Sequence, residues 1–188
     1  FSYSDSKSNS LSCLAGAFDW NGSSKPNKLG KDVTMLAPAS GLGTECAFEL
    51  GGKCFTAPFT PTALTRAQCE AEKDKLGIKE CGFESDYWAG AVKQCGGVSK
   101  MPTQADFTEL AKVLYNTSSI SSSGRISGLT LDTSKASSMG FTGSEFYVWS
   151  GEEYDSYFAY YRVFDSSDTY WVYTGRYYNL NQAVCLGD

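Results

Sequence analysis

Seven cysteines and the absence of histidine constrain this chain more than any other feature of its sequence. The cysteines are dispersed, and no two of them form a Cys-x-x-Cys pair. In a chain rich in glycine and serine this pattern predicts disulfides and an oxidising compartment, the alternative being buried free thiols in a cytosolic protein. Without histidine, the Ser-His and Cys-His catalytic couples and most zinc sites are excluded. We therefore expect a secreted or surface-displayed protein stabilised by disulfides, with no metal site and no cofactor.

The length and charge of the chain narrow its class further. Its 188 residues, 41% of them hydrophobic, suit one domain or one domain with an elaborated N-terminal half. Residues 136–188 carry only Arg162 and Arg176 against seven acidic side chains. Since an acidic surface repels phosphate groups, nucleic acid is not an expected partner. No apolar run reaches the ~18 residues needed to span a membrane, and the abrupt start at Phe1 is typical of a mature or trimmed chain.

Three helices are expected in the middle of the chain, over about 66–75, 86–95 and 104–115. Thr65 and Gln68 have the spacing of a capping box, and Gly77 suits the position after the helix end. Thr103 and Asp106 mark a second capped N-terminus. Apolar residues at i, i+3, i+4 and i+7 predict one buried face on each of the later two helices, formed by Trp88, Ala91, Val92 and Cys95 and by Phe107, Leu110, Ala111 and Leu114.

From Glu145 onward the apolar period changes to two, which predicts strands over 145–149, 157–164, 169–174 and 182–186. Residues 116–144 are rich in serine and glycine and are expected to form a long loop. Residues 1–60 indicate loops and short strands, with a Gly-Gly hairpin turn between Cys46 and Cys54. The pattern as a whole predicts an α+β fold.

Three short motifs follow one another in a recognisable order and context. Met101-Pro102-Thr103 opens a helix, residues 148–154 (Val-Trp-Ser-Gly-Glu-Glu-Tyr) lie on a strand, and Ala183-Val184-Cys185 lies near the end of the chain. They resemble, in turn, the Leu-Pro-Thr junction, the Trp-Ser-Ser-Thr-Glu-Tyr strand and the closing strand of bacterial C-type-lectin-like domains. This resemblance covers 84–188 and implies two helices packed on short antiparallel sheets. Residues 1–83 would then be an irregular, disulfide-stapled region with one helix, packed on the lectin-like part.

The resemblance also bears on the cysteines. In the fold it implies, the helix that ends at Cys95 and the strand that holds Cys185 are neighbours, so a Cys95–Cys185 disulfide is expected. The sequence itself suggests two local pairs, Cys69–Cys81 and Cys46–Cys54. Cys13 then remains unpaired or is linked outside this chain.

Residues 154–181 contain no lysine, glutamate, glutamine or methionine. In this the segment resembles the variable region of C-type-lectin-like proteins diversified by a retroelement, which rewrites adenines at the 3′ end of a gene. Mutation of adenine-adenine-pyrimidine codons cannot produce those four residues or tryptophan, so Trp171 would be an unmutated core position. The whole chain looks like the globular part of gut-bacterial pilin-like proteins of this type. The resemblance implies an extracellular or bacterial cell-surface receptor or adhesin that binds a protein or another cell-surface ligand.

The tyrosines of residues 154–181 also indicate a ligand-binding surface. Tyr157, Phe158, Tyr160 and Tyr161 occupy both parities of one strand, so they cannot all face the core, and exposed aromatic clusters mark binding surfaces. The alternative is that tyrosine simply favours strands and fills a core. The predicted ligand contacts are Tyr154, Asp155, Tyr157, Tyr160, Asp165, Ser167, Asp168, Tyr170, Tyr173, Tyr177, Tyr178, Asn179 and Asn181.

The sequence also bears on three other functions. Glu152, Glu153 and Asp155 could suggest a calcium site, but the Glu-Pro-Asn, Gln-Pro-Asp and Trp-Asn-Asp motifs of sugar-binding lectins are absent, which favours a solvated acidic loop. A structural pilin or fibre subunit, assembled through an N-terminal segment outside this sequence, is the main alternative. A formylglycine-generating type of enzyme would need a reactive cysteine in an electropositive setting, and Cys185 lies in an apolar segment with no basic neighbour.

Overall fold

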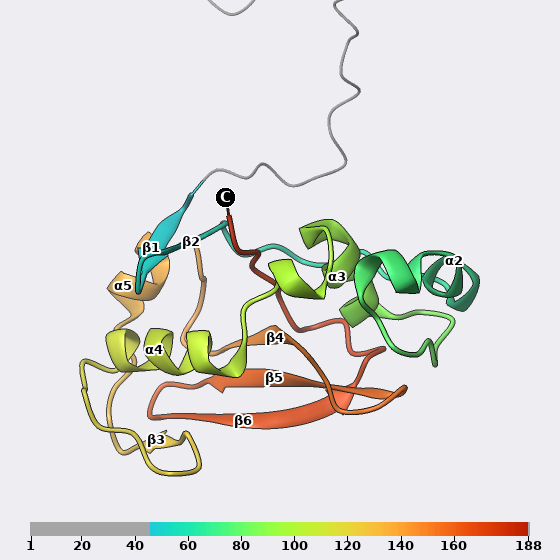
Figure 1. Ribbon diagram of the computed structural model, residues 1–188. Helices are drawn as coiled ribbons and strands as arrows, with labels where there is room; N and C mark the ends of the chain where they lie inside the picture. Colours follow the sequence, from blue (N-terminus) through green and yellow to red (C-terminus); the bar gives the residue numbers. More distant parts are fainter. Residues whose placement is uncertain (1–45, 188) are drawn as a thin grey trace, which may run out of the picture. The chain divides into compact units, whose positions relative to one another are not determined.

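The computed structural model describes residues 46–187, which form a mixed α+β fold with four α-helices and two antiparallel sheets (Figure 1). A two-stranded sheet consists of β1 (Phe48–Leu50) and β2 (Lys53–Phe55). A four-stranded sheet has the order β3-β6-β5-β4. In chain order the elements that follow β2 are α2 (Arg66–Leu76), α3 (Tyr87–Cys95), the 3-10 helix η1 (Val98–Lys100), α4 (Gln104–Leu114), β3 (Ile126–Ser127), α5 (Thr133–Ser138), β4 (Phe146–Glu153), β5 (Phe158–Phe164) and β6 (Asp168–Gly175).

The three predicted helices are present, each within about one residue of its expected bounds. In α2 the Thr65 side chain accepts a hydrogen bond from the Gln68 amide and the Gln68 side chain accepts one from the Thr65 amide, and the helix ends at Gly77 with a φ of 75°. Thr103 and Asp106 form the same reciprocal cap at the start of α4. The predicted faces are buried, apart from Cys95, which is half-buried.

The strands are confirmed in part. β4, β5 and β6 lie where alternation predicts them, and β4 continues to Glu153 through a register shift after Trp149. Residues 182–186 do not form a continuous strand. They make isolated bridges with three different partners, through Gln182 with Val148, Ala183 with Phe59 and Leu186 with Phe55. The expected long loop at 116–144 contains β3 and the short helix α5.

Two apolar cores lie against the larger sheet. Val148 and Trp149 follow one another in β4 and therefore point to opposite faces. Val148 is part of a core with Phe107 of α4, whereas Trp149 is part of a core with Trp88 of α3. Val148 and Trp149 are both fully buried, so β4 packs against one core on each of its faces.

Three disulfides are present, and they are the three that were expected. Cys46–Cys54 closes the β1–β2 hairpin, Cys69–Cys81 joins α2 to the loop after it, and Cys95–Cys185 joins the end of α3 to the C-terminal segment. Cys13 lies outside the described residues. Three disulfides are consistent with an oxidising, extracellular type of environment. Among residues 46–187, no helix is both long enough and apolar enough to cross a membrane.

Candidate ligand-binding surface

The exposed apolar side chains of the described residues gather in one part of the chain. Seven large hydrophobic residues are exposed, and only Leu129 lies outside 154–181. The other six are Tyr154, Tyr157, Phe158, Tyr173, Tyr177 and Leu180. A gathering of this kind is typical of a surface that meets a partner, because single exposed apolar residues are normally scattered.

Four of the aromatic rings contact one another, and we call Tyr154, Phe158, Tyr160 and Tyr173 the aromatic cluster. Tyr154 stacks on Tyr173 with 4.1 Å between ring centroids and 9° between the planes. Tyr160 lies directly opposite Tyr173 in the β5–β6 ladder, and its ring meets both tyrosines edge-on, at 5.6 Å for Tyr154 and 6.1 Å for Tyr173. Phe158 completes the group, 5.8 Å from Tyr173.

Strand geometry explains why this cluster is exposed. Every second residue of a strand points to the same face of the sheet. In β5 one face is therefore shared by Phe158, Tyr160, Arg162 and Phe164. At the Phe164 end, that face is covered by the core that contains α4. At the other end, neither Phe158 nor Tyr160 belongs to either core, and Phe158 is 38% exposed. The sheet therefore extends beyond its core and presents the aromatic cluster to solvent.

The turn between β4 and β5 holds the cluster in place. Asp155 Oδ1 accepts hydrogen bonds from the amides of Tyr157 at 2.7 Å and Phe158 at 2.8 Å. The amides of Tyr154 and Asp155 both donate to the Phe158 carbonyl oxygen. Asp155 is therefore tied to its own backbone, and its first role is to shape the turn. Tyr173 raises the pKa of Tyr154 through its charge and a side-chain hydrogen bond.

A second aromatic group lies beside the same turn. The rings of Tyr157 and Tyr177 both meet Phe83, which belongs to the loop between α2 and α3. Gly175 is needed for this arrangement, because a Cβ at that position would lie 2.3 Å from Cε1 of Tyr177. Leu180, 61% exposed, follows in the same segment.

The segment also contains two buried arginines. Arg176 is fully buried, with Nη2 2.7 Å from Asp86 Oδ2 and Nη1 3.3 Å from Glu153 Oε1, and its guanidinium lies 4.4 Å from the ring centroid of Trp88. Arg162 is also fully buried. It donates to Thr169 and to the Gly124 carbonyl oxygen, and burial lowers its pKa to about 10. Both arginines of the acidic C-terminal part are thus framework residues.

The predicted contacts near the β5–β6 turn belong to a different place. The β5–β6 turn lies at the end of the hairpin opposite to the β4–β5 turn (Figure 1). Asp165, Ser167, Asp168 and Tyr170 belong to the β5–β6 turn or to the start of β6, whereas Tyr154 follows β4. Since six residue steps separate Phe158 from Phe164, the two ends are about 20 Å apart. Asp168 forms an ion pair with Arg125, and Asp165 bonds to the Ser166 hydroxyl and the Ser167 amide. The structure therefore divides the predicted contacts into two groups, one at each end of the hairpin.

The predicted contacts also differ in exposure. Asn181 is fully buried, so its side chain cannot meet a ligand at the surface. Strand alternation could not have predicted this burial, because β6 ends at Gly175 and Asn181 lies beyond it. Tyr178 is half-buried against the core that contains Trp149, whereas Asn179 is exposed. Phe158 and Phe83 were not among the predicted contacts. The signal for Phe158 was its shared parity with Tyr160, while nothing in the sequence linked Phe83 to this segment.

The acidic residues near the turn have structural partners. Glu152 accepts a hydrogen bond from the Gln104 amide at the start of α4, and Glu153 accepts one from the Lys79 amide and contacts Arg176. Within residues 46–187 there is no group of three or more His, Cys, Asp or Glu side chains that could hold a metal ion. The chemistry that this surface offers is therefore stacking, apolar contact and hydrogen bonding through tyrosine hydroxyls.

Comparisons with protein-family models, with curated proteins and with solved structures find no match to this chain.

Proposed function

We propose that this protein is a surface-displayed receptor or adhesin that binds a protein or another cell-surface ligand through residues 154–181. The observation that carries the proposal is the exposure of large apolar side chains. Six of the seven in the described part of the chain belong to this one segment. Tyrosine supplies large, rigid contact area at low entropic cost, as it does in antibody loops.

The order of elements supports a C-type-lectin-like arrangement as the framework of this surface. Helix α3 is followed by Met101-Pro102-Thr103, by the capped helix α4 and, after β3 and α5, by the three antiparallel strands β4, β5 and β6. The Trp-Ser-Gly-Glu-Glu-Tyr motif begins within β4, and the Cys95–Cys185 disulfide has the pairing that this fold implies. The disulfides also support display outside the cell, in an oxidising compartment.

The division between buried and exposed positions supports retroelement diversification of the segment. Trp171, the one residue that adenine mutagenesis cannot produce, is half-buried against Phe107 and lies under the Arg162 guanidinium at 5.0 Å. The aromatic cluster, in contrast, consists only of tyrosine and phenylalanine, which that process can produce. A framework of fixed residues with freely replaceable side chains between them is what a diversified binding surface requires.

The proposal is tested by replacing Tyr154, Tyr157 and Tyr173 together with alanine. These side chains are each 46–49% exposed, so the melting temperature should remain within a few degrees of the wild type while binding to a panel of immobilised glycans and cell-surface proteins is lost. Leu129→Ala is the matched control, since it removes an exposed apolar side chain outside the segment. Retained binding by the triple variant, or its unfolding, would contradict the proposal.

A further inference from the structure

The loop between α2 and α3 lies directly against the proposed binding segment. The Lys79 amide donates to Glu153 Oε1 at 3.2 Å, and Arg176 Nη1 donates to the Glu80 carbonyl oxygen at 2.9 Å. At Gly82 the approach is so close that a Cβ would lie 2.4 Å from the Ser156 carbonyl oxygen. The turn and the end of β6 therefore rest on backbone that lies 74 and 96 residues earlier in the chain, respectively.

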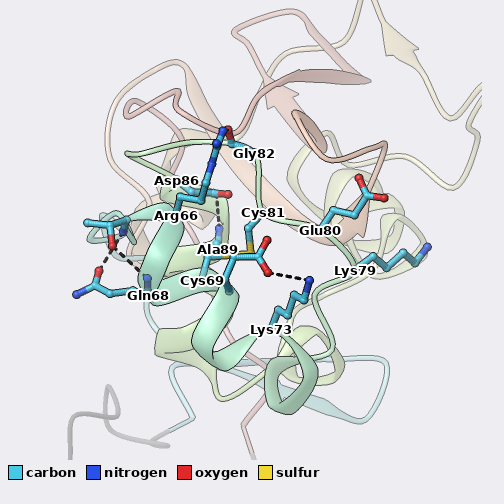
Figure 2. The surroundings of a disulfide bond; sticks show 12 residues. Arg66, Gln68, Cys69, Lys73, Lys79, Glu80, Cys81, Gly82, Asp86 and Ala89 are labelled. Carbon is cyan, nitrogen blue, oxygen red and sulfur yellow. Dashed lines mark hydrogen bonds and ion pairs between the residues drawn. A yellow bond between two sulfur atoms is a disulfide. The ribbon is translucent and has the colours of Figure 1, made fainter.

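The same loop is fixed on its far side by covalent and polar contacts (Figure 2). Cys81 is bonded to Cys69, which is fully buried in α2. The Arg66 side chain donates to the Gly82 carbonyl oxygen. At the end of the loop, Asp86 caps α3 through the Ala89 amide. The loop cannot shift without disturbing α2 or α3, so whatever it presents has a fixed position.

Phe83 is what this loop presents to the binding segment. Its ring lies between two exposed tyrosines, 5.5 Å from Tyr157 with an interplanar angle of 79° and 5.0 Å from Tyr177 with an angle of 73°. The tyrosines are 49% and 57% exposed, whereas Phe83 is half-buried beneath them. Edge-to-face packing of this kind restricts the orientation of both tyrosine rings.

We propose that Phe83 is a positioning residue of the binding surface, and that the Cys69–Cys81 disulfide keeps it in place. The inference rests on the proposed function, because Tyr157 and Tyr177 matter as contacts only if the segment binds a ligand. It adds a fixed part to a surface whose other side chains vary. Any aromatic residue at 157 or 177 meets the same ring at the same place, so the range of orientations is limited by the scaffold and not by the variable segment.

The test uses fluorine NMR on the protein with 3-fluorotyrosine at position 157 or, in a second sample, at position 177. Phe83→Leu keeps an apolar side chain but removes the ring, so each signal should move most of the way to the value of free fluorotyrosine. Phe83→Tyr keeps the ring and should restore the wild-type shift. Unchanged signals in Phe83→Leu at both positions would overturn the proposal.

The disulfide is tested by the double variant Cys69→Ala/Cys81→Ala, with Cys46→Ala/Cys54→Ala as the matched control. The control also removes a short-range disulfide, but from the β1–β2 hairpin, where Phe55 packs in the other core. The first double variant should move both fluorine signals and raise amide hydrogen exchange at Arg176, whose amide donates to the Tyr157 carbonyl oxygen, by about tenfold. The control should do neither, and equal effects of the two double variants would overturn the role of Cys69–Cys81.

Failure of this inference is distinguishable from failure of the proposed function. The fluorine and exchange measurements need no ligand and report only on the arrangement of Phe83, Tyr157 and Tyr177. The aromatic cluster, whose ring contacts do not include Phe83, reports on binding through Tyr154 and Tyr173.

Discussion

Replacing Arg176 by methionine should destabilise the protein more than any change at the exposed tyrosines. The guanidinium is completely buried between the carboxylates of Asp86, also fully buried, and Glu153, whose side chain is 7% exposed. Methionine fills a similar volume and keeps the packing on Trp88, so the change isolates the loss of charge and hydrogen bonding. What remains is a pair of buried carboxylates without their cation.

The magnitude follows from the geometry. Removing one partner of a buried ion pair costs about 3–5 kcal/mol, because the other charge stays buried and unpaired. Loss of the cation–π contact at 4.4 Å from the Trp88 centroid acts in the same direction and is worth about 1–2 kcal/mol in a desolvated site. We expect a total loss of about 4–7 kcal/mol, a large part of the roughly 5–15 kcal/mol by which an ordinary domain is stable. The melting temperature should fall by about 8–28 °C.

The assay is urea denaturation followed by circular dichroism, with the slope against urea unchanged if the native state remains compact. The double variant Arg176→Met/Asp86→Asn should be more stable than the sum of its single changes predicts, by at least about 1 kcal/mol, because the uncompensated charge has been removed. A loss below about 1 kcal/mol for Arg176→Met, or strict additivity in the cycle, would refute the reasoning that Arg176 is a framework residue.

Three further predictions concern the disulfides, the charge of Asp106 and the gene. Removing the Cys95–Cys185 disulfide, with its sequence separation of 90, should cost about 4–5 kcal/mol in urea denaturation, against about 2–3 kcal/mol for the β1–β2 disulfide with its separation of 8; equal losses would contradict the chain-entropy argument. Burial acts to raise the pKa of Asp106, but hydrogen bonds from Lys53 and from the Thr103 cap hold it below its ordinary value. The stability that the ionised Asp106 contributes is therefore present above pH ~4 and disappears as the pH falls through the lower folded-state pKa. The difference in unfolding free energy between pH 7 and pH 3 should be smaller in Lys53→Met than in the wild type. In the gene, a nearly identical repeat beside a reverse-transcriptase gene should differ only at adenines, and the differences should fall at codons of the aromatic cluster and not at those of the two buried arginines; differences at random bases, or no repeat, would remove the diversification claim.

The elements that sequence analysis located correctly have local causes. Helix α2 begins where Thr65 and Gln68 can cap each other and ends where Gly77 adopts a positive φ, and all of these contacts lie within a few residues of the helix. The hairpin of β5 and β6 follows from alternation on both sides of a polar turn. The Cys95–Cys185 pairing is different, because it depended on a resemblance and not on any signal near the two cysteines.

The elements that sequence analysis missed depend on contacts that are distant along the chain. Residues 182–186 alternate as a strand does, but each bridge goes to a different neighbour, and alternation does not specify how many partners a segment has. Helix α5 buries only Ala136, so it has no apolar stripe to detect. Phe83 reaches Tyr157 and Tyr177 only because a disulfide and a close glycine approach hold its loop there.

The segment from 154 to 181 contains both the most replaceable and the least replaceable side chains of this surface. Their arrangement explains how one segment can provide contact residues and framework residues together. Along β5, Phe158 and Tyr160 are partly exposed, while Arg162, on the same face, is buried by the core that begins there. After β6, Tyr177 is exposed, whereas its neighbour Arg176 is fixed by two carboxylates. Variation at the exposed positions changes what the surface presents without removing a buried charge or a core side chain. The boundary between framework and contact residues therefore lies where each core stops covering its face of the sheet. The position of a residue along the chain does not reveal this boundary.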